Sequence, residues 1–230
     1  MRFQPVLVLV AAAGLFQAGL SRAAAAPALA PEEIIRRTIA QDKKLQERRK
    51  PYRYSLSITR DYLNDAGKAT RSETETQEVG GTQRVGYEVK TETKTENVSP
   101  VIDFAKIINR FRLTLEDEDT CNGVSCYRIR YTPKPDQPYN SREEKVMNAM
   151  TGQVWISQAD FSILQNEGKL SRPVSVAWIF ATMRELQYTF KTAPLPNGDF
   201  GPSLLRYEFK VNAPFVTIHQ RHTRRMTGYR

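Results

Sequence analysis

The sequence predicts an α+β, mainly β fold. We expect one strongly curved antiparallel sheet that forms an unclosed half-barrel, covered by an N-terminal helix and short helices over an apolar cavity. Six segments alternate apolar and polar residues with period two, which is typical of strands with one buried and one solvated face. Turn pairs such as Asn122-Gly123 and Asn197-Gly198 lie between such segments. A twisted sheet of this many strands tends to curl, and its aromatic-rich concave face needs a cover.

The first thirty residues have the three parts of a secretory signal. Arg2 supplies a positive start, residues 6–16 form a short apolar core, and Ala23–Ala26 offers small residues for cleavage. The apolar run is shorter than the ~20 residues that a membrane-spanning helix needs. We therefore expect a signal peptide over residues 1–25, with cleavage after Ala25 or as late as Ala30.

After the signal, we expect residues 31–230 to form a single half-barrel domain. No cysteine lies near the cleavage site, so the protein should be periplasmic and soluble without a lipid anchor. Removal of Arg2 and Arg22 with the signal lowers the formal charge from +9 to +7. This basic balance favours anionic surfaces, and export excludes nucleic acid as the natural partner.

A helix is predicted after the signal. Pro31 suits the first helical turn, Glu32 and Glu33 suit the positive end of the helix dipole, and Pro51 stops the helix. Its narrow apolar stripe needs a surface to pack on. The stripe consists of Ile34, Ile35, Ile39 and Leu45.

The alternating segments that follow supply this surface. They are residues 52–59, 84–90, 111–116, 127–132, 185–190 and 205–211. The stretches 68–78 and 91–97 are polar on both faces, which favours a solvated hairpin or a sheet edge.

Two short helices interrupt the strands. Ser99-Pro100 begins one that carries Val101, Phe104, Ile108 and Phe111 at helical spacing. A capping box at Ser141–Glu144 begins the other, after a loop stiffened by three prolines. We expect residues 132–150 to flank the mouth of the cavity, together with residues 174–183, which are apolar on both faces. A crossover segment without a binding role is the alternative for the first of these, and a strand sandwiched in the core is the alternative for the second.

Little in the chain supports catalysis or metal binding. It has two histidines and two cysteines, and it lacks a nucleophile elbow, a His-Glu-x-x-His motif and a phosphate-binding glycine loop. The acidic run 116–119 is interpreted as a solvated turn or a weak cation site rather than as glycosidase-type carboxylates, which need a defined cleft. We therefore expect no enzyme, no cofactor and no metal. Cys121 and Cys126 are expected to form a disulfide, because the compartment is oxidising. A zinc site with His219 and His222 is the weaker alternative, since histidines three apart in a strand point to opposite faces.

Several segments resemble the LolA/LolB-like superfamily of outer-membrane lipoprotein-sorting proteins. The similar segments are CNGVSCYRIRYTPK (121–134), SREEKV (141–146), TGQVWIS (151–157) and PVSVAW (173–178). The resemblance spans about Tyr52 to Tyr229. Ser157 replaces the aspartate usual in the family, and Phe200-Gly201-Pro202 stands where a Trp-x-Pro turn is common. The resemblance implies an unclosed antiparallel barrel, capped by helices, whose hydrophobic cavity takes acyl chains in a carrier that is not an enzyme.

The functional expectation is therefore a periplasmic carrier or binding protein for lipoprotein acyl chains or other lipids. A contact with a membrane surface or an envelope protein would accompany this role. The alternative is a structural protein that fills its cavity with its own side chains. The residues expected to line the cavity are Tyr54, Leu56, Val85, Tyr87, Phe111, Leu113, Met147, Met150, Trp155, Trp178, Phe180 and Met183.

Overall fold

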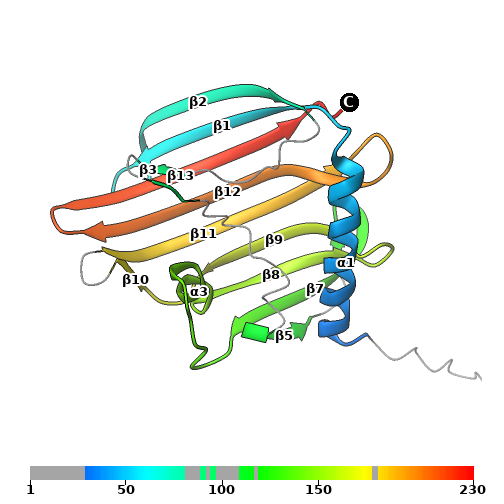
Figure 1. Ribbon diagram of the computed structural model, residues 1–230, viewed down its shortest axis with the longest axis horizontal. Helices are drawn as coiled ribbons and strands as arrows, with labels where there is room; N and C mark the ends of the chain where they lie inside the picture. The colour runs from blue at the N-terminus through cyan, green and yellow to red at the C-terminus, as the bar shows by residue number, and fades with distance from the viewer. Residues whose placement is uncertain (1–28, 81–88, 92–93, 97–108, 117–118, 178–180) are drawn as a thin grey trace, which may run out of the picture.

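The computed structural model describes residues 29–80, 89–91, 94–96, 109–116, 119–177 and 181–230. Within them an 11-stranded antiparallel sheet runs in the order β2-β1-β13-β12-β11-β9-β8-β7-β5, with β10 paired to β11 and β6 to β7. The two ends of this order do not meet, so the sheet is unclosed (Figure 1). The predicted fold class, mainly β with an unclosed antiparallel sheet and few helices, is confirmed.

The helices and strands have the following bounds: α1 (Pro31–Arg49), β1 (Tyr54–Leu63), β2 (Ala69–Val79), β3 (Val89–Thr91), β4 (Lys94–Glu96), β5 (Phe111–Leu115), β6 (Asp119–Cys121), β7 (Val124–Pro133), α3 (Arg142–Met147), β8 (Met150–Ser157), β9 (Ile163–Leu170), β10 (Val174–Ala177), β11 (Ala181–Pro194), β12 (Phe200–Ala213) and β13 (Val216–Thr227). Strands β3 and β4 pair with each other in a separate two-stranded sheet. The helix predicted to begin at Ser99-Pro100 falls on residues 97–108, which lie outside the described residues. Of the predicted strand 84–90, only the last two residues are described, in β3.

Helix α1 begins and ends where the sequence predicts. Pro31 is in its first turn, and its buried residues are Ile34, Ile35, Thr38 and Leu45. The helix crosses one end of the sheet, over strands from β12 to β5 (Figure 1). Arg48 near its C-terminal end donates from Nε to Oδ2 of the buried Asp199 at 2.8 Å, which ties the helix to the β11–β12 turn.

The cross-strand register separates the sheet into two faces. We call the face that packs on α1 the inner face, and the opposite one the outer face. One inner-face row runs through Tyr131, Gly152, Gly168, Tyr188, Tyr207 and His222 on six neighbouring strands. The next residues along each strand, such as Arg130, Gln153 and Thr189, belong to the outer face.

The buried apolar residues form two clusters on the inner face. The larger includes Ile34 and Ile35 of α1 and the inner residues of β5, β7, β8, β11 and β12, with Phe111, Ile129 and Tyr131 almost fully buried. The smaller lies at the β1–β2–β13 end of the sheet and consists of Tyr54, Leu56, Val79 and Met226. Strand β2 is the exposed, polar edge strand that the sequence predicts.

Two tyrosines pack over two glycines in the larger cluster. Oη of Tyr131 lies 2.6 Å from Oη of Tyr188, and it donates to the carbonyl oxygen of Glu167 at 3.0 Å. A Cβ atom on Gly168 would lie 2.6 Å from Tyr131 Oη and from a ring carbon of Tyr188. A Cβ on Gly152 would collide with the Glu167 carbonyl oxygen and Tyr131 Oη. The two rings therefore need the space that both glycines leave.

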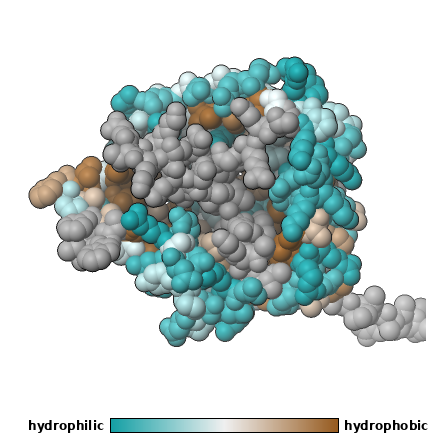
Figure 2. All heavy atoms as spheres, in the orientation of Figure 1, coloured by the Kyte–Doolittle hydropathy of each residue, from teal (hydrophilic) through white to brown (hydrophobic). Residues whose placement is uncertain are grey.

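The β12–β13 hairpin ends in a tip that extends beyond its neighbour β1. The last β1–β13 pair is Tyr62 with Gln220, whereas β12 and β13 stay paired out to Ala213 and Val216. We call residues 213–218 the hairpin tip. Apolar atoms gather at this projecting end of an otherwise mostly hydrophilic face (Figure 2).

The predicted disulfide is not formed in the structure. Cys121 ends β6, Cys126 lies in β7, and both are free thiols. Burial raises the pKa of Cys121 and raises that of Cys126 to about 11. Both thiols are therefore in the protonated, unreactive form at neutral pH.

Gly152→Ala should destabilise the protein by about 2 kcal/mol, because its methyl group displaces Tyr131 and the Glu167 carbonyl. Urea unfolding followed by circular dichroism measures this change. Gly80→Ala is the matched control, since nothing lies within 4 Å of the Cβ it would add. An unchanged unfolding midpoint for Gly152→Ala would show that the tyrosine packing is wrong.

Alkylation of the native protein by iodoacetamide should be slow at Cys126 at pH 8 and faster as the pH approaches 11, because only the thiolate reacts. Peptide mass spectrometry measures the modified fraction at each pH. After denaturation without a reductant, both cysteines should be labelled. If neither is labelled, a disulfide joins them and the free thiols of the structure are incorrect.

Candidate functional site

Among the residues that the structure describes, side chains of the inner face are closely packed in one half and partly exposed in the other. Around β5, β7 and β8 the side chains are closely packed under α1. Farther along the sheet, Leu186 and Phe190 of β11 and Phe209 of β12 contact the same cluster but remain partly exposed. We call these three residues the apolar strip. Leu186 and Phe209 are direct cross-strand partners, which makes their side chains neighbours on the inner face.

Charged and polar groups border the apolar strip on its β13 side. His222 packs on the ring of Tyr207 at 4.8 Å between centroids and on Phe209 at 5.8 Å. Its Nδ1 lies 3.0 Å from Tyr207 Oη, and its Nε2 lies 3.0 Å from Gln220 Oε1. Burial, with the nearby positive charges of Arg60 and Arg224, lowers the pKa of His222 to about 4. The imidazole is therefore neutral at pH 7, with Nδ1 accepting from Tyr207 and Nε2 donating to Gln220.

The described lining candidates do not form one cavity wall. Phe111, Leu113 and Met150 are buried in the larger cluster, with Met147 partly buried against it. Tyr54 and Leu56 are in the smaller cluster at the other end of the sheet. Met183 is partly buried in β11 and pairs with Val174 and Val211. Val85, Tyr87, Trp178 and Phe180 lie outside the described residues.

Trp155 is placed apart from the other candidates. It lies between the buried Val154 and Ile156 and belongs to the outer face, where Arg128 is its cross-strand partner. Its indole Nε1 donates to Oδ2 of Asp119 at 3.1 Å. This bond and the Thr120 backbone N–H hold the pKa of Asp119 below its usual value. The acidic run is thus partly an ion-paired cluster, because Glu116 and Asp119 both bind Arg128.

The two segments expected to flank a cavity mouth do meet. Helix α3 contacts β10 at the end of the sheet away from α1 (Figure 1). Ser141 caps α3 by accepting a hydrogen bond from the Glu144 N–H at 3.1 Å, as the capping box predicts. Ser171 donates its backbone N–H to the carbonyl of Ala149 at 2.7 Å, which fixes the approach to β10.

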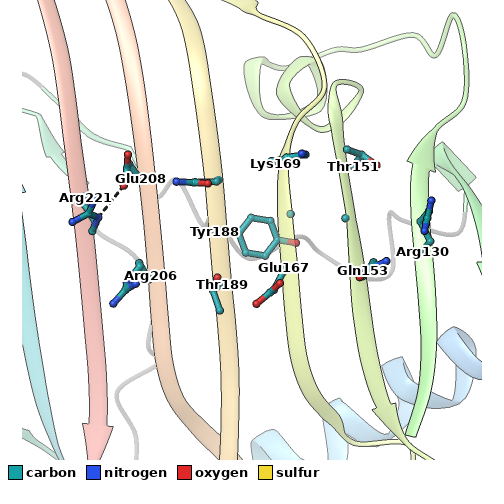
Figure 3. Close-up of a pocket in the computed structure, with 13 residues that line it drawn as sticks. Arg130, Thr151, Gln153, Glu167, Lys169, Tyr188, Thr189, Arg206, Glu208 and Arg221 are labelled. Atoms are coloured by element: carbon teal, nitrogen blue, oxygen red, sulfur yellow. Dashed lines mark hydrogen bonds and ion pairs between the residues drawn. The ribbon is translucent and has the colours of Figure 1, made fainter. Parts of the chain in front are cut away.

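A polar pocket of about 860 Å³ lies on the outer face (Figure 3). Two neighbouring cross-strand rows line it, drawn from β7, β8, β9, β11, β12 and β13. Its charged residues are Arg130, Glu167, Lys169, Arg206, Glu208 and Arg221. Arg221 Nε donates to Glu208 Oε2 at 2.8 Å, and His219 Nε2 lies 3.1 Å from the other oxygen. Burial opposes the ionisation of Glu208, but these hydrogen bonds outweigh it and lower its pKa.

The structure does not bring His219 and His222 together. His219 contacts Glu208 on the outer face and His222 contacts Tyr207 on the inner face, so the two lie on opposite faces as predicted. Among the residues that the structure describes, no group of three His, Cys, Asp or Glu residues is placed to hold a metal ion. Within those same ranges, no helix is long and apolar enough to cross a membrane.

Sequence reasoning missed the outer pocket and the polar border of the apolar strip. The pocket residues come from six strands and are brought together only by register. The position of His222 could be predicted in part, because alternation along a strand assigns each residue to one of two faces. Which of the two faces is the inner one depends on its pairing with Tyr207.

No protein-family model and no curated protein sequence matches the chain. Among solved structures it is similar to a DUF1329 family protein from Desulfovibrio piger, with 8% identity and a TM-score of 0.37 over 87% of this chain and 92% of that one. It is also similar to a domain assigned to outer membrane lipoprotein-sorting proteins from Vibrio parahaemolyticus, with 9% identity and a TM-score of 0.38 over 84% and 91%. A third is the MucA/MucB complex of Pseudomonas aeruginosa, with 6% identity and a TM-score of 0.28 over 83% and 94%.

Acid should destabilise the protein partly through His222. Its pKa rises from about 4 in the folded state to about 6.5 on unfolding, so between these values the unfolded state binds more protons. The free energy of unfolding should therefore fall by about 2 kcal/mol through this group between pH 7 and pH 5. The His222→Gln variant lacks this group, so its free energy of unfolding should fall by about 2 kcal/mol less than that of the wild type over the same pH interval. Urea titrations at each pH measure the difference. Equal losses in both proteins would contradict the buried, neutral histidine.

Proposed function

We propose that the chain is an exported, non-enzymatic binding or carrier protein that holds the acyl chain of a lipid or lipoprotein against its inner face. The observation that carries this proposal is the apolar strip, whose large side chains are only partly covered. Water in contact with Leu186, Phe190 and Phe209 is unfavourable, and an acyl chain would displace it.

The packed half of the inner face leaves little room for a ligand, so the proposed site is limited to the other half. Phe111, Leu113 and Met150 already pack on α1 and on neighbouring strands, so this half behaves as the self-filled core of the alternative interpretation. We therefore place the acyl chain between β11 and β13, away from α1. The smaller cluster at Tyr54 and Leu56 would then border the far end of this site.

The border of the strip fits an anionic head group. Arg60, on β1, pairs in register with His222 and has the carboxylate of Glu73 at 3.7 Å. Arg224, two residues from His222 on the same strand, is buried and shares the inner face. Their positive charges favour an amphiphile whose carboxylate or phosphate lies at this border while its chain covers the apolar strip.

Leu186→Asp should weaken the binding of a dansyl-labelled fatty acid by roughly tenfold or more, because the carboxylate would be buried under the chain. Fluorescence titration measures the Kd. Gln187→Asp is the matched control, since the next residue of β11 is exposed on the outer face.

A second variant separates the loss of the site from the loss of the fold. Leu186→Trp fills the same space without a charge, and it should lower probe binding while thermal unfolding stays cooperative. Equal binding by wild type, Leu186→Asp and Leu186→Trp, or no binding by the wild type, would contradict the proposal and favour a self-filled scaffold.

A further inference from the structure

The hairpin tip exposes several apolar side chains together. Phe215 is fully exposed at 108% of its reference area, Val216 is 52% exposed and Ile218 is 40% exposed. Pro214 is exposed beside them. Single exposed apolar residues are ordinary, but a contiguous group on a projecting element indicates a surface that binds something.

The backbone of the tip is also strained. Ala213 pairs with Val216, so Pro214 and Phe215 form a two-residue hairpin loop. Phe215 has a φ of 67°, in the left-handed region that favours glycine and that a bulky side chain rarely adopts. Asn-Gly or a similar pair is usual in such loops. A phenylalanine that is strained and also fully exposed contributes nothing to packing, which points to a role outside the folded chain.

We propose that the hairpin tip inserts into the surface of an anionic lipid bilayer. Residues 211–218 carry no charge, so the tip can enter the interface without burying one. Phenylalanine and β-branched residues are suited to this depth, and Pro214 has no backbone N–H to desolvate. The base of the hairpin carries both signs, with Lys210 3.0 Å from Asp65. Attraction to an anionic surface therefore comes from the net charge of the chain, which is +9 in full and +7 without Arg2 and Arg22 of the expected signal peptide.

A bilayer fits the tip better than a protein partner does. A stable protein interface uses about 20–30 residues on each side, whereas the tip has six. A lipid surface adapts to a narrow projection and needs no matching pocket. This surface is separate from the apolar strip, which lies on β11 and β12 at the inner face.

Flotation with vesicles of phosphatidylglycerol and phosphatidylethanolamine tests the proposal. The wild type should float with these vesicles and less with phosphatidylcholine vesicles. Phe215→Asp should lower vesicle binding by roughly tenfold or more, the scale of removing one large side chain from an apolar medium. Tyr139→Asp is the matched control, because Tyr139 is 53% exposed in the loop before α3, away from the tip, and it should float like the wild type.

Phe215→Gly separates the loss of membrane binding from the loss of folding. Glycine relieves the left-handed φ, so this variant should melt at the same temperature as the wild type or higher, and yet float poorly. All Phe215 variants should keep the fatty-acid probe affinity, and Leu186→Asp should keep vesicle binding. Flotation of Phe215→Asp at the wild-type level would overturn the proposal. A wild type that stays unbound with both vesicle types would overturn it too, and would leave a protein as the partner of the tip.

Discussion

Most of the described strands form one open sheet, each face of which must either be covered or carry polar side chains, and the other features of the structure follow from that constraint. Helix α1 covers one end of the inner face, where Ile34 and Ile35 join the larger cluster. On the outer face the described strands carry hydrogen-bonded and ion-paired side chains, such as Glu208 with Arg221. The exposed edge strand β2 is polar along nearly its whole length, which discourages pairing with other chains.

The sequence predicts those parts of the fold whose pattern is local. Helix α1, the capped helix α3 and strands with clean alternation, such as 127–132 and 205–211, were expected and are present. Strand β9 was not expected, because its buried inner positions include Asn166 and Gly168 in place of large apolar residues. Gly168 is required there by Tyr131 and Tyr188, and that requirement depends on register with other strands.

The candidate site was less predictable than the fold. Val154, Trp155 and Ile156 are all apolar, so composition alone does not tell which one faces outward, and pairing with Arg128 decides it. The expected lining residues are divided between a packed cluster and a smaller distant one. The sequence does not show which part of the sheet α1 packs on, and this packing decides which of these residues are buried. The hairpin tip was missed because an apolar run such as Ala213–Ile218 has the composition of a buried strand.

The proposed ligand would cover the partly exposed apolar strip beside the packed half of the inner face. Native mass spectrometry of the protein purified from its native cells, without detergent, tests this proposal most directly. The account predicts a bound species with the mass of an acylated molecule that is released by collisional activation. A protein that is consistently ligand-free, and that also takes up no added fatty acid, would contradict the account.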